Sequence, residues 1–200
     1  MTIWIHTLKT YSALITEKGG WMVLSVLSIL FGLCFSLDQA SYYYMGDLYS
    51  TFQIILISLL VGMVIGPIYW LLTSLILFWL GQLFGGCSSS SWKDMAVVVA
   101  WSGIPFISKL ILWILSFILF GQELFLSKTP ELDSSAVLIL TYWTFLFFKF
   151  VLTSWYFWLL IKGIGFVHDF SIWKALPVFL IGMFILRMIF YLSGLTIYPF

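Results

Sequence analysis

The chain has 200 residues, of which 62% are hydrophobic and only 8% are charged. Soluble domains carry about 25% charged residues, so this composition excludes an ordinary soluble domain and predicts an integral membrane protein. The formal net charge is +1, and without a basic excess we expect no nucleic-acid partner. The apolar runs are long and lack strand-like alternation, which favours membrane-spanning helices over a barrel.

The first predicted element is a short amphipathic segment that precedes the first apolar run. Apolar residues recur at helical spacing between residues 2 and 18, a pattern typical of a helix that lies on the membrane surface. Gly19-Gly20 is expected to end this helix. We therefore expect residues 1–20 to form an amphipathic N-terminal segment in the cytoplasm.

Five apolar stretches follow, and each is long enough to cross the roughly 30 Å hydrocarbon core of a bilayer. The predicted fold class is all-α, an integral membrane helical bundle with five transmembrane helices in residues 21–197. The second stretch is too long for one simple crossing and too short for two, so we expect one long helix that is kinked or tilted. The approximate spans are 21–37, 52–84, 95–120, 136–161 and 172–195.

Prolines and small residues predict how these helices bend and pack. Pro67 lies inside the second span and Pro105 inside the third, and a proline inside a helix removes one hydrogen bond and kinks it. Gly62 and Gly66 form a GxxxG pair, which is typical of closely packed membrane helices. A second face of small residues runs along the first span, and we expect both faces to dock another membrane protein. The small residues of the first span are Ser25, Ser28, Gly32 and Ser36.

The loop lysines predict the orientation of the spans. The N-terminal segment and the turns at 85–94 and 162–174 together carry five lysines, whereas the two opposite loops carry Lys128 alone with five carboxylates. By the positive-inside rule the N-terminus lies in the cytoplasm and the C-terminus outside. We expect the protein to lie in the plasma membrane.

A faint internal repeat predicts how the spans are grouped. Residues 78–80 and 157–159 both read Phe-Trp-Leu, and each is followed by a segment that contains Ser, Trp and Lys, at 91–94 and at 171–175. Each pair begins near the inner end of one span and ends at the start of the next. We therefore expect one leading span and two parallel helical hairpins.

Three cations interrupt the apolar spans: Lys109, Lys149 and Arg187. Each lies roughly 10–15 residues into its span, near the middle of the membrane or slightly outside it. A charge at that depth costs a few kcal/mol or more. No carboxylate lies at comparable depth in any expected span, so the three cations lack an obvious internal partner of opposite sign.

Polar residues accompany these cations on their helices. Ser102, Tyr142 and Tyr191 each share a helical face with one of them. Two interpretations stay open. In the first, the three polar faces form an anion- or lipid-binding cavity between spans three, four and five. In the second, the long side chain of each cation snorkels toward the outer interface and meets phosphates, water, Glu123 or Asp133.

Other chemistry has little support in the sequence. The two histidines, His6 and His168, are far apart and no cysteine cluster accompanies them, so we expect no metal site and no cofactor. The four serines at 88–91 have no neighbouring base, and no Walker, Rossmann or metalloprotease pattern occurs. We expect no catalytic residue and no enzymatic activity.

Several stretches together resemble the YIP1 family of multi-span membrane proteins, in its bacterial branch. They are SLDQASYYYMGD at 36–47, VIGPIYWL at 64–71, LGQLFGG at 80–86, AWSGIPFISKLILWILSFILFGQELF at 100–125 and HDFSIWKAL at 168–176. The resemblance implies five spans, a cytoplasmic N-terminus and no established catalytic activity. It also implies, from some bacterial relatives, work beside ABC-type exporters.

From the resemblance we expect a non-enzymatic accessory or interaction subunit of a membrane transport or export machinery. Its expected partners are membrane lipids and another membrane protein, or further copies of the same chain. The alternative is a protein that binds or transports a lipid or an anion, using a cluster of Lys109, Lys149 and Arg187 near the middle of the membrane.

Overall fold

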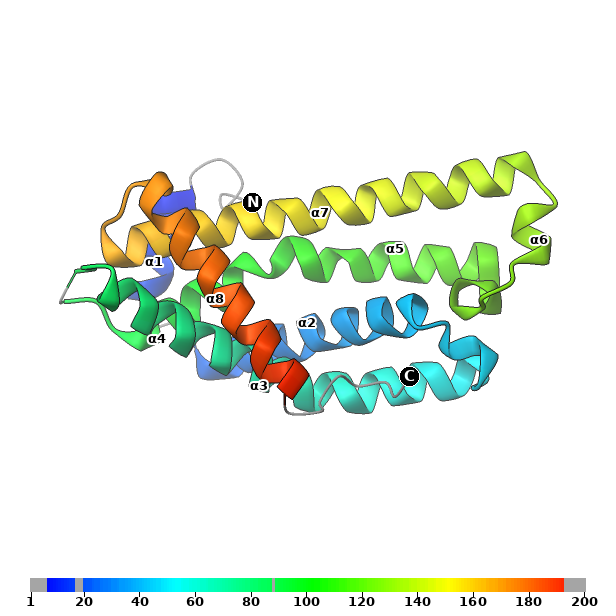
Figure 1. Cartoon of the computed structure of the whole chain (residues 1–200), viewed down its shortest axis with the longest axis horizontal. Helices are drawn as coiled ribbons and strands as arrows, with labels where there is room; N and C mark the ends of the chain where they lie inside the picture. The colour runs from blue at the N-terminus through cyan, green and yellow to red at the C-terminus, as the bar shows by residue number, and fades with distance from the viewer. Residues whose placement is uncertain (1–6, 17–19, 88, 193–200) are drawn as a thin grey trace. The chain divides into compact units, whose positions relative to one another are not determined.

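A computed structural model of the chain describes residues 7–16, 20–87 and 89–192. All the regular elements in these ranges are helical, and they include five helices that are long and apolar enough to cross a membrane. The predicted all-α class with five spans is thus confirmed for the described part of the chain (Figure 1). The five candidate spans are Trp21–Tyr42, Thr51–Leu83, Trp92–Phe125, Ala136–His168 and Ile172–Leu192.

Helices α2 (Trp21–Tyr42), α3 (Thr51–Leu83), α7 (Ala136–His168) and α8 (Ile172–Leu192) are each a single element. The third span is divided into two helices and a 3-10 turn. The remaining elements are α1 (Thr7–Thr16), η1 (Met45–Asp47), α4 (Trp92–Ser102), α5 (Ile104–Phe120), η2 (Gly121–Phe125) and α6 (Pro130–Asp133).

Two helices extend beyond their predicted ends. Helix α2 continues to Tyr42 instead of ending near residue 37, because Leu37 and Ala40 are both buried and prolong its apolar face. Helix α7 continues to His168, where Asp169 takes a left-handed conformation with φ of 56°. The Phe170 amide then donates to the Gly165 carbonyl over 2.7 Å, which is the usual bond of a helix ending in a Schellman motif.

The described residues fall into two compact units. Unit 1 contains those of Met1–Ser28, Ile68–Gly103 and Tyr156–Phe200, and unit 2 contains Ile29–Pro67 and Ile104–Trp155. Helices α2, α3 and α7 therefore contribute residues to both units. The grouping into a leading span and two parallel hairpins stays a prediction.

The unit boundaries fall beside the residues that break helices. On α3 the boundary lies at Pro67, inside the helix as predicted. In the third span it lies at Gly103, where α4 ends and α5 begins. The prediction that Pro105 lies inside a continuous helix is wrong, because Pro105 is the second residue of α5. A proline in the first helical turn loses no intrahelical hydrogen bond.

In unit 1, α1 is held against other helices by Tyr11. Its side chain is fully buried, and its hydroxyl forms a 2.7 Å hydrogen bond with Ser102 and donates to the Leu159 carbonyl over 3.3 Å. Burial raises the pKa of Tyr11 to about 12. The apolar face of α1 therefore contacts protein at Tyr11, where the sequence predicted contact with the membrane surface.

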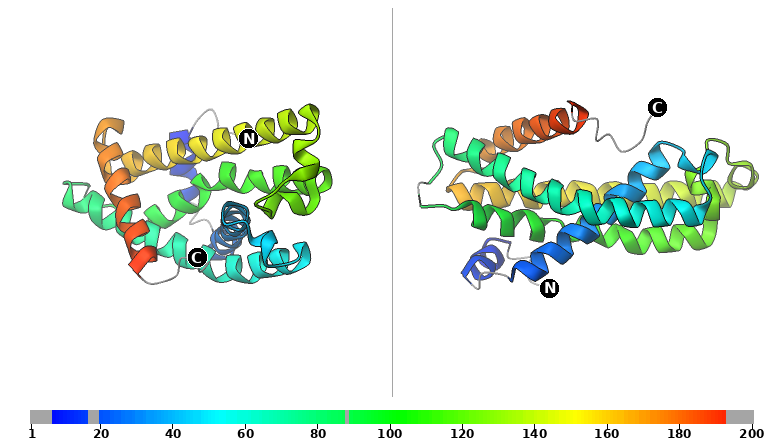
Figure 2. Two further views of the ribbon diagram at one scale, coloured as in Figure 1. Left: turned by 45° about the vertical axis from the view of Figure 1, so that its right-hand side comes forward. Right: turned by 90° about the horizontal axis from the view of Figure 1, so that it is seen from below.

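In unit 2, α2 and α3 cross at glycine residues (Figure 2). A Cβ atom at Gly32 would lie 2.6 Å from the Gly66 Cα, and one at Gly62 would lie 2.6 Å from the Leu33 nitrogen. The two small-residue faces do exist, but here they pack on each other. The prediction that they dock a second protein is wrong at these positions, since the chain itself covers them.

The far end of unit 2 is closed by the two 3-10 turns. The Ser41 hydroxyl donates to the Leu124 carbonyl over 2.7 Å, and the Ser127 amide donates to Asp47 Oδ1 over 3.1 Å. Gly46 lies against the backbone of Phe125. These contacts tie the end of α2 to the end of α5 and fix the register of the two helices.

Replacing Gly62 by Ala should lower the free energy of unfolding by about 1–3 kcal/mol, the usual cost of overpacking. The added methyl group meets the α2 backbone, which cannot rotate away as a side chain can. Thermal unfolding in detergent measures the loss. Gly20→Ala is the matched control, because no atom lies within 4 Å of a Cβ at Gly20, and equal stability of the two variants would contradict the close α2–α3 contact.

Candidate functional site

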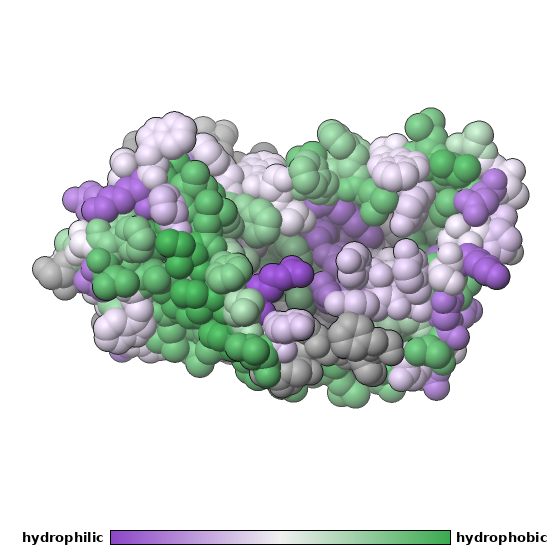
Figure 3. Space-filling view, in the orientation of Figure 1, coloured by the Kyte–Doolittle hydropathy of each residue, from purple (hydrophilic) through white to green (hydrophobic). Residues whose placement is uncertain are grey.

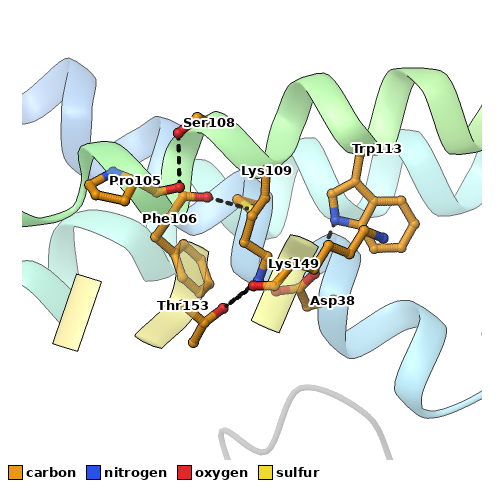
Figure 4. Close-up of polar contacts among 9 residues, drawn as sticks. Asp38, Pro105, Phe106, Ser108, Lys109, Trp113, Lys149 and Thr153 are labelled. Carbon is orange, nitrogen blue, oxygen red and sulfur yellow. Dashed lines mark hydrogen bonds and ion pairs between the residues drawn. The ribbon is translucent and has the colours of Figure 1, made fainter. Parts of the chain in front are cut away.

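The site we describe is a cluster of polar side chains inside unit 2, on α2, α5 and α7 (Figure 4). Asp38 comes from α2, Lys109 and Trp113 from α5, and Lys149 and Thr153 from α7. Lys109 and Trp113 are four residues apart, and so are Lys149 and Thr153. Each of these two pairs therefore lies on one face of its helix. We call these five residues the polar cluster.

An ion pair between Asp38 and Lys109 forms the centre of the polar cluster. Asp38 Oδ2 pairs with the Lys109 ammonium, and Oδ1 accepts a 3.0 Å hydrogen bond from the Trp113 indole. Both carboxylate oxygens are thus used. Since each oxygen faces a donor on the same face of α5, Asp38 fixes α2 against that helix.

Lys109 is almost completely buried, with 4% of its surface exposed. Besides the ion pair, its ammonium donates to the Thr153 hydroxyl over 3.3 Å and lies 4.0 Å from the centre of the Phe106 ring. The Thr153 hydroxyl in turn donates to the Lys149 carbonyl over 2.8 Å. A buried charge with these partners links three helices.

The expectation that the cations lack an internal carboxylate is therefore wrong for Lys109. Asp38 lies within α2, one turn before its end, because that helix continues to Tyr42. The carboxylates proposed for snorkelling have local partners: Glu123 accepts from the Leu132 amide over 2.7 Å, and Asp133 accepts from the Thr129 hydroxyl over 3.3 Å.

Lys149 contributes a second positive charge to the polar cluster. Its side chain is half-buried, and its ammonium lies 3.3 Å from the centre of the Trp113 ring. A cation–π contact is worth about 0.5–2 kcal/mol, whereas a lysine charge at the centre of a span costs about 2.5–3.5 kcal/mol on insertion scales. The ring offsets only part of that cost, and the cluster carries two cations against one carboxylate.

The other predicted site residues lie outside the polar cluster. Arg187 and Tyr191 are exposed on α8 in unit 1, and Ser102 is buried in unit 1. Tyr142 is in unit 2, where its ring packs edge-to-face on Phe120 at 5.7 Å. Unit 2 thus contains two of the three predicted cations, and a role of any of these residues in anion or lipid binding stays a prediction.

In the described part of the chain, no group of three or more His, Cys, Asp or Glu residues is placed to hold a metal ion. His6 lies outside the described residues. His168 is buried in unit 1 between Gly81 and Gly86, so closely that a Cβ atom at either glycine would collide with the imidazole. The His168 imidazole thus packs against two glycines at the end of α7.

Sequence reasoning missed Asp38 and Trp113 as members of the cluster. The available signal was that Asp38 directly follows the first predicted span, and that apolar residues continue past it at helical spacing. Because a charge within a span needs a partner, extending the first helix by one turn would have found the pair.

Comparison with known proteins gives one match. Residues 1–195 match the family model described as the Yip1 domain. No curated protein and no solved structure matches the chain.

Asp38→Asn should destabilise the protein strongly, because Lys109 stays buried without its counter-charge. Removing one partner of a buried ion pair costs about 3–5 kcal/mol, and chemical or thermal unfolding in detergent measures this loss. Combining Asp38→Asn with Lys109→Met removes both charges, so the double variant should lose less than the sum of the two single variants.

The matched control is Asp133→Asn, since Asp133 is an exposed carboxylate at the end of the short helix α6. It should change the free energy of unfolding by no more than about 0.5 kcal/mol. Strictly additive losses in the Asp38 and Lys109 cycle, or an equal loss from Asp133→Asn, would contradict the ion pair.

Proposed function

Because this chain belongs to the Yip1 family, we propose that it is a non-enzymatic accessory or interaction subunit of a membrane transport or export machinery. It is a multi-pass membrane protein with several long apolar helices. A cytoplasmic N-terminus is part of the same proposal and rests on the loop lysines. Location in the plasma membrane is also part of the proposal and follows from the proposed role in transport or export. The polar cluster supports a non-catalytic role, since its central charges are used to join helices.

The observation that carries this proposal is the exposure of α7. In the most apolar 18 residues of α7 no residue is buried, whereas 28% to 39% are buried in the corresponding stretches of the other four spans. Much of the surface seen in Figure 3 is apolar as well, but α7 stands out by its large aromatic side chains. The exposed ones are Trp143, Phe147, Phe148 and Phe150, each at least 50% exposed.

Aromatic residues at a membrane interface are often a belt at headgroup level. Phe147 and Phe150 lie 11 and 14 residues after the start of α7 at Ala136, which is roughly 17–21 Å along the helix. Phe147 and Phe150 therefore lie well below the outer end of α7 and are too deep to belong to a belt at headgroup level. Aromatic side chains bury large areas and dominate the energetics of protein interfaces. We therefore assign the face of α7 that carries Trp143, Phe147 and Phe150 to contact with a helix of the partner membrane protein.

Photo-crosslinking in intact membranes tests this assignment. A photoreactive phenylalanine analogue at Phe147 should form a crosslink to a protein that mass spectrometry identifies as part of a transport complex. The control position is Leu60 on α3, which is 57% exposed against 61% for Phe147 and lies in the same unit. Equal capture from both positions, or adducts with lipid and with the same chain alone, would contradict the proposal.

The captured partner then allows a quantitative test. The double variant Trp143→Ala with Phe147→Ala should reduce co-purification of that partner about tenfold or more, since interface aromatic residues typically contribute above 1 kcal/mol each. The matched variant is Leu60→Ala with Val64→Ala on α3, where Val64 is 59% exposed. Undiminished co-purification in the α7 variant would exclude this face as the contact surface.

A further inference from the structure

We propose that Lys149, over the Trp113 ring, is part of a binding site for an anionic phosphate group. The site is the side of the polar cluster in unit 2 that carries the half-buried Lys149. This inference goes beyond the accessory role and does not depend on it.

The first argument is the charge of the polar cluster. Both carboxylate oxygens of Asp38 have partners, since one pairs with Lys109 and the other accepts a hydrogen bond from the Trp113 indole. Lys149 therefore adds a positive charge that the ion pair does not neutralise. Its described partner is an aromatic face, which compensates a cation less well than an anion does.

The second argument is access. The Lys109 side chain is 5% exposed and the Asp38 side chain 25% exposed, and Lys149 is half-buried. In Figure 4 the Lys149 side chain extends over Trp113, beside the ion pair and not into it. A ligand that contacts the Lys149 ammonium therefore need not break the bond between Asp38 and Lys109.

The third argument concerns depth. Helix α7 has 33 residues, about 50 Å of helix against a hydrocarbon core of roughly 30 Å. Lys149 lies 13 residues after Ala136, roughly 20 Å along the helix. Lys149 therefore lies in the same part of α7 as Phe147 and Phe150, and its long side chain carries the ammonium from that depth toward the interface, where the lipid phosphates lie.

The chemistry of the donor selects the ligand class. A lysine ammonium has three donors on a flexible stem and binds phosphate as a compact charge. The phosphate group can come from the headgroup of an anionic phospholipid or from a free phosphate in water. The two sources share one recognition chemistry, and the experiment separates them.

The test compares purified wild-type protein with Lys149→Met, Lys149→Arg and Lys162→Met. Lys162 is the matched control, because its ammonium also lies over a tryptophan of α7, 5.0 Å from the Trp158 ring centre, but belongs to unit 1. Each protein is incubated with mixed micelles or vesicles of phosphatidylcholine, with and without phosphatidylglycerol. Native mass spectrometry counts the retained phosphatidylglycerol, and a second titration uses inorganic phosphate with the melting temperature as readout.

We expect wild type, Lys149→Arg and Lys162→Met to retain the anionic lipid, and Lys149→Met to retain about tenfold less or lower, the loss typical of one charge-assisted hydrogen bond. Stabilisation by inorganic phosphate that depends on Lys149 would instead identify a free phosphate as the ligand. If Lys149→Met does not fold, Lys149→Gln replaces it. The proposal is overturned if wild type shows no preference for phosphatidylglycerol and no stabilisation by phosphate, or if Lys149→Met and Lys162→Met behave alike.

Discussion

The ion pair between Asp38 and Lys109 is the interaction on which unit 2 depends. Either charge alone inside a membrane span costs a few kcal/mol, so pairing favours α2 and α5 at one register. The Trp113 indole occupies the second carboxylate oxygen, and Thr153 brings α7 to the same ammonium. Apolar packing in lipid is weakly directional, since lipid tails resemble the helix surfaces. Charged and hydrogen-bonded contacts therefore specify which faces of α2, α5 and α7 meet.

Close backbone packing supplies the second constraint. The glycines of α2 and α3 let the two backbones approach at Gly32 and Gly62, and side chains at those positions would separate them. The same closeness keeps α2 in place, so that Asp38 reaches Lys109. A small-residue face in a membrane helix is thus evidence for a helix neighbour, but the neighbour can come from the same chain.

Much of this fold is readable from the sequence because apolar length is a strong signal. Five long runs gave five spans, and the unusual length of α3 was visible directly. The ends of α2 and α7 were missed, since Asp38 resembles the start of a loop and the left-handed Asp169 that ends α7 has no marked local signature. Lys109 and Lys149 were found because charges within apolar runs are conspicuous. Their proximity to Asp38 could not be predicted, since it depends on the register of α2. The depth of a residue in its span also could not show that Arg187 belongs to a different unit from Lys109 and Lys149.

The separation of Asp38 and Lys109 by 71 positions has a consequence for biosynthesis. The carboxylate leaves the ribosome first, and at about 5–20 residues per second its counter-ion follows roughly 4–14 seconds later. During that interval the first span carries an uncompensated polar group near its end. The nascent α2 must therefore stay at the edge of the translocon, or keep its last turn in the interface, until α5 arrives. Assembly of unit 2 is in this sense ordered in time by a single charge.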